Sequence, residues 1–143
     1  MYRNILVPVD LDQPATVSKA IAEASSLARC FGAKLTVCSV VVASEALIRG
    51  DWLPISVQQL LLDARSRLAS LAAETDHGRA CDVEVAEGSV AGGVLDIAAR
   101  IGADLIVLVS HRPAVRDYLL AANAIRVARR ARCSVLIARH GDD

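Results

Sequence analysis

Aromatic side chains are almost absent from this sequence. Of its 143 residues, 54% are hydrophobic but only 3% are aromatic. The core must therefore be built from Ala, Val, Leu and Ile. A chain of this length is expected to form one domain, residues 1–143, and to bury about two-thirds of the surface that it exposes when unfolded.

An excess of charge is also lacking, because Lys and Arg together number 16 and so do Asp and Glu. Nucleic acids and anionic membranes both select a basic face, so this balance argues against either as a partner. Arginines nevertheless gather near the C-terminus, at Arg126, Arg129, Arg130, Arg132 and Arg139. A helix face exposed to water explains this cluster, and so does contact with an anion or a protein partner.

Long apolar runs and paired cysteines are missing too. No segment approaches the roughly 20 apolar residues of a membrane span, and residues 1–4 lead into a strand pattern rather than a signal peptide. The four cysteines, Cys30, Cys38, Cys81 and Cys133, have no metal-ligand spacing and are expected to act as small apolar side chains. We expect a cytoplasmic protein with reduced thiols and no metal site.

Five short apolar segments predict β-strands, and helical patterns lie between them. The predicted strands are residues 5–9, 35–42, 81–86, 105–109 and 134–139. Alternating strands and helices with right-handed crossovers give a parallel sheet that has helices on both faces. The first and fourth strands are the most uniformly apolar and belong in the middle, whereas the third alternates with charge and belongs at an edge. The predicted strand order is 3-2-1-4-5.

The predicted fifth strand is an edge strand without protection. Its residues carry neither charge nor proline before Arg139, and an apolar edge of this kind invites pairing with another chain. We therefore expect a symmetric homodimer through this strand. The expected interface residues are Ser134, Val135, Leu136, Ile137 and Ala138.

The predicted ligand crevice lies between the first and fourth strands, where the strand order reverses. No GxGxxG follows the first strand, no GxxxxGK[ST] occurs anywhere, and the third and fifth strands do not end in the aspartate and lysine of a phospho-receiver. Ser110 and His111 are adjacent, which normally points their side chains apart, so they do not suggest a nucleophile with its base. We assign no catalytic residue.

Several segments, in order over the whole chain, resemble the universal stress protein family: residues 1–10, Glu87-Gly88 with the following helix, 102–107 and 133–137. The resemblance implies a dimeric, Rossmann-like α/β fold of the adenine nucleotide alpha hydrolase type. In many members it also implies an ATP or AMP site, built on a pattern G-x2-G-x8/9-G-[ST] between the fourth strand and the last helix.

This sequence departs from that glycine pattern. Val109, Arg112, Ala121 and Ala122 stand at the matching positions, and the resemblance extends to a branch that also lacks the second glycine. Glycine in such a loop permits a positive φ and lets backbone N–H groups approach phosphate. Losing two or three charge-assisted hydrogen bonds, at about 1.5–3 kcal/mol each, weakens binding roughly 10²- to 10⁶-fold.

A nucleotide held as the resemblance implies would lie against residues of four segments. They are Pro8, Val9, Asp10, Val40, Leu108, Val109, Ser110, His111, Arg112, Ala121, Ala122 and Asn123. Asp10 would contact the ribose or a metal-bound water, or else cap its own loop. Arg112 would contact phosphate, or else remain an exposed charge. The lost glycines leave the adenosine half, at Asp10, Val40 and Leu108, in place.

The leading hypothesis is a dimeric stress-response module that regulates by binding, with a degenerate ATP site and weak or absent nucleotide binding. The alternative is an ATP- or AMP-binding family member that acts as a nucleotide-dependent switch or a slow ATPase. A third interpretation is a structural partner domain that works through the arginine-rich last helix and the open edge strand, with an unknown protein as its partner.

Overall fold

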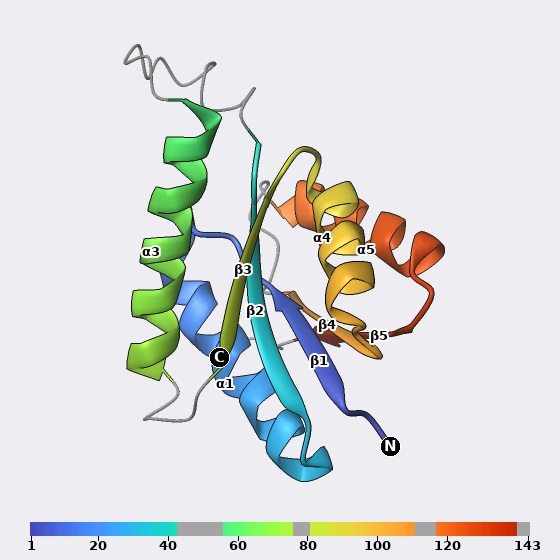
Figure 1. The fold of residues 1–143 in the computed structure, drawn as a ribbon. Helices are drawn as coiled ribbons and strands as arrows, with labels where there is room; N and C mark the ends of the chain where they lie inside the picture. Colours follow the sequence, from blue (N-terminus) through green and yellow to red (C-terminus); the bar gives the residue numbers. More distant parts are fainter. Residues whose placement is uncertain (43–55, 76–80, 111–116, 140–143) are drawn as a thin grey trace.

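The computed structural model describes residues 1–42, 56–75, 81–110 and 117–139. Five parallel strands form one sheet in the order β3-β2-β1-β4-β5 (Figure 1), which confirms the predicted fold class and strand order. The strands are β1 (Asn4–Pro8), β2 (Lys34–Val41), β3 (Asp82–Glu87), β4 (Leu105–Ser110) and β5 (Ser134–Arg139).

Two pairs of helices cover the two faces of this sheet (Figure 1). The core under α1 (Pro14–Phe31) and α3 (Val57–Thr75) includes Val7 and Val107, whereas the core under α4 (Val90–Ile101) and α5 (Asp117–Arg130) includes Leu6 and Ile106. Neighbouring residues of one strand thus enter opposite cores, as the two-residue period of a strand requires. The central strands are apolar throughout because both of their faces are covered.

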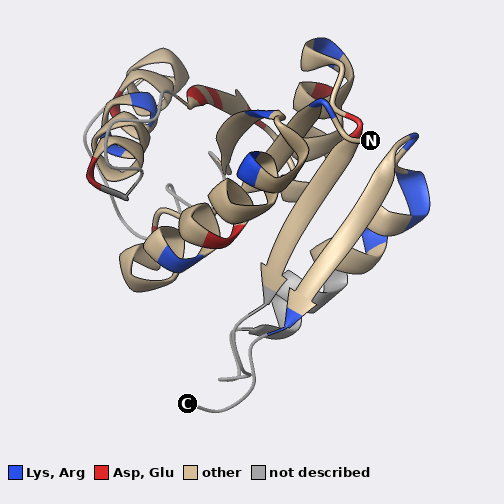
Figure 2. Cartoon of the chain, turned by 90° about the horizontal axis from the view of Figure 1, so that it is seen from below, with Lys and Arg blue, Asp and Glu red and all other residues tan. Residues whose placement is uncertain are grey.

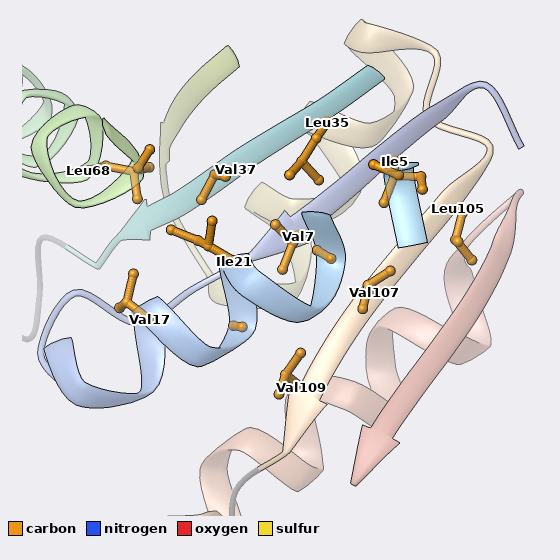
Figure 3. Close-up of a cluster of buried hydrophobic side chains, with 14 of the residues drawn as sticks. Ile5, Val7, Val17, Ile21, Leu35, Val37, Leu68, Leu105, Val107 and Val109 are labelled. Atoms are coloured by element: carbon orange, nitrogen blue, oxygen red, sulfur yellow. The ribbon is translucent and has the colours of Figure 1, made fainter. Parts of the chain in front are cut away.

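Aliphatic side chains build both cores, as the composition predicts. Figure 3 shows Val17 and Ile21 of α1 with Val7, Val37 and other strand residues in the first core. Cys38 lies fully buried in the second core, where burial, followed by the nearby Glu84 charge, raises the pKa of its thiol far above the usual range. This cysteine is therefore an apolar filler.

Local capping chemistry sets the ends of α1 and α4. Gly32 and Gly102 end α1 and α4 with φ angles of 64° and 69°, and a left-handed residue at this position favours glycine. Ser89 begins α4, since its hydroxyl accepts a hydrogen bond of 3.2 Å from the Gly92 backbone N–H. The predicted strands differ from β1, β2 and β3 by one residue; β1 ends at Pro8, which has no N–H for a ladder.

The amino ends of β1 and β4 are tied together by Asp104. Its two carboxylate oxygens accept hydrogen bonds from the backbone N–H groups of Arg3 (2.8 Å) and Asn4 (2.9 Å). The Asn4 side-chain amide in turn donates to the Ile101 carbonyl at 2.6 Å. These contacts hold the two central strands in register at the end opposite the predicted crevice.

No helix among the described residues combines the length and the apolar character that a membrane crossing requires.

Candidate functional site

The two central strands separate toward their carboxyl ends. The register between β1 and β4 contains only two pairs, Ile5↔Leu105 and Leu6↔Ile106. Each strand continues to pair on its outer side, β1 with β2 as far as Pro8↔Cys38 and β4 with β5 over its whole length. A fork therefore opens beyond Leu6, at the place where the strand order reverses. This is the position predicted for the ligand crevice.

The β1 side of the fork ends in a loop that holds itself in shape. The Asp10 carboxylate accepts a hydrogen bond of 2.9 Å from the Asp12 N–H, and the Asp10 carbonyl accepts one of 3.1 Å from the Gln13 N–H. From α3, the Arg67 guanidinium donates to the Leu11 carbonyl at 3.1 Å. Asp10 thus has the loop-capping role that the sequence offered as one of two alternatives, because its side chain forms an Asx turn.

Val40 and Leu108 lie on the α4–α5 face of the sheet, where both are partly buried against the second core. Val40 also packs directly on the α4 backbone: a Cβ placed on Gly93 would lie 2.7 and 2.8 Å from its two methyl carbons. A side chain at position 93 would force Val40 or α4 to shift. The Val40 side chain is therefore held against the backbone of α4.

Val109 lies on the opposite face of the sheet. As a residue of β4 it pairs with Ala138 of β5. Its side chain is only 8% exposed and packs in the core beneath α1 (Figure 3). A valine suits a paired strand and needs no left-handed backbone. The residue at the first glycine position of the family pattern is therefore part of the core.

The last predicted phosphate contacts fall inside a helix. Because α5 begins at Asp117, Ala121 and Ala122 are its fifth and sixth residues. Only the first four N–H groups of an α-helix lack a carbonyl partner within the helix. The amides at the two alanines are therefore past the free donors, the last of which belongs to residue 119. Asn123, one residue on, is partly buried.

Comparison with known proteins defines the family. The model of the universal stress protein family matches residues 1–139. The chain belongs to this family. It is 30% identical over 144 residues to universal stress protein G of Escherichia coli O157:H7, an alignment that covers 97% of this chain and 100% of the relative.

Two solved structures show the same fold at low sequence identity. Hypothetical protein MJ0577 superposes with a TM-score of 0.74 at 18% identity, and the match covers 100% of this chain and 99% of the other. A universal stress protein from Archaeoglobus fulgidus, in complex with dAMP, gives a TM-score of 0.55 at 19% identity, with 95% and 97% covered.

The structure of this universal stress protein brings together only part of the predicted site. Pro8, Val9 and Asp10 follow one arm of the fork and Leu108 lies on the other, with Val40 on the neighbouring strand. His111 and Arg112 lie outside the described residues, and the side chains of Ser110, Ala121 and Ala122 are not described.

Sequence reasoning missed the groups that shape the fork. Asp104 has an identifiable signal, since an acidic residue directly before a buried strand often caps neighbouring backbone. Burial acts to raise its pKa, but the N–H groups of Asn4 and Arg3, its own N–H and the N-terminal charge together lower it. Gly93 has a weaker signal: glycine inside a helix is costly unless something packs against it closely.

Proposed function

We propose that residues 1–143 form a single-domain universal stress protein that regulates by binding, as a homodimer, with a degenerate nucleotide site. The fork between β1 and β4 retains the scaffold of an adenine nucleotide site. The positions that would bind phosphate lack the glycines and the hydroxyl residue of the family pattern. No catalytic role is assigned to any residue.

The observation that carries this proposal is the position of Val109. A glycine there could turn its N–H toward a phosphate, whereas a valine paired with Ala138 and buried under α1 is committed to the core. Ala121 and Ala122 add to the loss, because their amides lie beyond the free donors of α5. Two or three lost contacts at about 1.5–3 kcal/mol each support a weakening of roughly 10²- to 10⁶-fold.

The homodimer part of the proposal is supported by β5. In Figure 2 this strand carries no charge along its length and is basic only where it ends. Leu136 and Ile137 remain 39% and 41% exposed at the edge of the sheet. Pairing two copies of β5 about a two-fold axis would cover these side chains and satisfy the unpaired backbone groups of both edges.

A second candidate function is nucleotide-dependent switching by ATP or AMP, with slow hydrolysis as its extreme form. It is favoured by the open fork and by the relative that was solved with dAMP. Val40 and Leu108 could still receive an adenine ring, while Arg112 and the first amides of α5 could receive phosphate. The self-capped Asp10 argues against a strong contact to ribose.

Titration calorimetry with ATP and AMP, with and without magnesium, tests this proposal. We expect no binding in the micromolar range, and a micromolar dissociation constant with either nucleotide would overturn the degenerate site in favour of the switch. The triple variant Val109→Gly, Ala121→Gly, Ala122→Ser should bind ATP at least about tenfold more tightly if the glycine losses matter. Its control is Ala121→Gly alone, which restores one position and leaves the core valine.

A further inference from the structure

Charge is separated along this chain although the total is zero. Residues 105–143 contain seven of the 16 basic residues and three of the 16 acidic residues, so they carry a net charge of +4 and residues 1–104 carry −4. Most of the positive charge lies on α5, on β5 and in the connection between them, where the five C-terminal arginines are all exposed. Figure 2 shows the basic residues gathered toward the end of this helix.

Ion pairing differs between the two parts. In the acidic part, Lys34 pairs with Asp82 at 2.7 Å, and Arg100 and Arg65 pair with Glu84 at 2.9 and 3.8 Å. None of the five C-terminal arginines makes a comparable contact with another described residue. The negative end of the helix dipole accounts for arginines in the last turn of α5, but not for those outside it.

An aliphatic side chain lies at one side of the basic face. Ile125 is 57% exposed, whereas Val127, which points into the second core, is 1% exposed. At about 100° per residue, Arg129 lies about 40°, Arg126 about 100° and Arg130 about 140° from Ile125, all in the same direction around the helix. Val127 lies about 160° away in the opposite direction. The face combines an exposed isoleucine with unpaired guanidinium groups.

We propose that this basic face, defined by Ile125, Arg126, Arg129 and Arg130, docks an acidic segment of another protein, with an aliphatic residue of that segment against Ile125. Guanidinium groups match carboxylates in geometry and charge, and arginine clusters are a recurring way in which proteins recognise acidic segments. The exposed Ile125 beside them offers a contact to an aliphatic residue. The surface depends neither on nucleotide binding nor on pairing of β5.

Charge and composition separate this occupant from two others. A second copy docked through the same face would oppose arginine to arginine, because a two-fold contact brings a surface against itself. Single-stranded nucleic acid selects aromatic side chains for stacking, and none lies in the described residues of this face. An acidic, partly aliphatic protein segment fits both the guanidinium groups and the exposed isoleucine of the surface.

Fluorescence anisotropy of the full chain tests the proposal with three labelled probes of equal charge. They are a glutamate-rich peptide with leucine at every fourth position, the same peptide with serine for leucine, and a single-stranded RNA. We expect the leucine peptide to bind most tightly. Arg126→Glu with Arg130→Glu should weaken it at least about tenfold, and Ile125→Ser should remove its advantage over the serine peptide.

The matched control is Lys19→Glu with Arg29→Glu, which makes the same charge change on exposed positions of α1. Binding should be unchanged there, and circular dichroism should show all variants folded. Arg126→Gln with Arg130→Gln, a milder change, should give an intermediate loss. Equal losses in the α1 control, absence of leucine-peptide binding, or tighter binding of RNA would each overturn the proposal. A change of oligomeric state in the α5 variant would instead make the face a contact between copies, and would overturn it too.

Discussion

The two edges of the sheet are built in opposite ways. At the β3 edge, the Arg65 guanidinium donates to the Val83 carbonyl at 3.0 Å, and Glu84 pairs with Arg100 on the other side of the sheet. At the β5 edge, no charge stands between Ser134 and Ala138, and Leu136 and Ile137 are exposed. Surface ion pairs contribute little to stability, but charged side chains at a sheet edge oppose pairing with another strand, which makes the β3 edge the less accessible of the two. The same sheet has one closed edge and one open edge.

This difference between the edges predicts how many copies the assembly contains. A sheet with two open edges could add copies without limit, whereas a sheet with one open edge closes after two copies. The contacts of Arg65 with Val83 and of Arg100 with Glu84, together the β3 clamp, therefore complement the proposed pairing of β5. Each edge can be altered separately, and the two changes should have opposite effects on assembly.

Closing the open edge should have the largest effect. Leu136→Lys places a cation in the middle of β5, and two such cations would face each other in a symmetric pair. We expect the dimer dissociation constant to rise roughly 10²-fold, because like charges and lost apolar burial both oppose the contact. Sedimentation velocity across a concentration series measures this shift. Val57→Lys, at a comparably exposed apolar position on α3, should leave assembly unchanged; equal dissociation in both variants would contradict pairing through β5.

The next largest effect should come from the packing of α4 against β2, where Gly93 meets Val40. Gly93→Ala would place a methyl group within 2.8 Å of both Val40 methyl carbons. We expect the free energy of unfolding to fall by about 1–3 kcal/mol, because an overpacked core shifts backbone and rotamers. Denaturant unfolding measures the loss. Adding Val40→Ala should recover part of it, and strict additivity of the two changes would rule out this contact as the cause.

Opening the closed edge should change assembly more than stability. Arg65→Ala leaves the Val83 carbonyl without its side-chain donor, with a stability cost below about 1 kcal/mol for so exposed a pair. We expect species larger than a dimer at high concentration, detected by light scattering. Arg67→Ala removes an arginine from the same helix that binds the Leu11 carbonyl instead. If neither variant forms larger species, the clamp does not guard the edge.

Much of the fold was predictable because the information is local. Runs of apolar residues identified the central strands, alternation identified the β3 edge, and Gly32, Ser89 and Gly102 marked helix ends. Each signal depends on a few neighbouring residues and on the periods of the strand and the helix. The strand order followed from the same burial pattern.

The site was less predictable because it depends on contacts between distant residues. The fork requires Asp104 to fix the register of β1 from 100 residues away, and the β3 clamp requires Arg65 to reach across 18 residues. Val109 could be matched to a glycine position, but only tertiary packing shows that its side chain lies under α1. The bond between Asp10 and the Asp12 amide is short-range, but the sequence alone did not show that it forms, and the ribose contact stays a prediction.

The smallest expected effect concerns the end of the sheet opposite the fork. Burial acts to raise the Asp104 pKa, but the Asn4 and Arg3 N–H groups and the N-terminal charge bring it below its ordinary value of 3.8. A lowered folded pKa means that the stabilisation is present above the unfolded pKa and is lost as pH falls through the folded pKa. Stability should therefore decline as the pH is lowered below about 4, in part through this group. Thermal unfolding from pH 7 to pH 2 measures the decline, and Asp104→Asn should unfold more easily at pH 7 and flatten the slope at low pH. If stability depends on pH equally in Asp104→Asn and in the unchanged protein, this carboxylate does not contribute to the pH dependence. Strand pairing alone would then hold β1 and β4 in register.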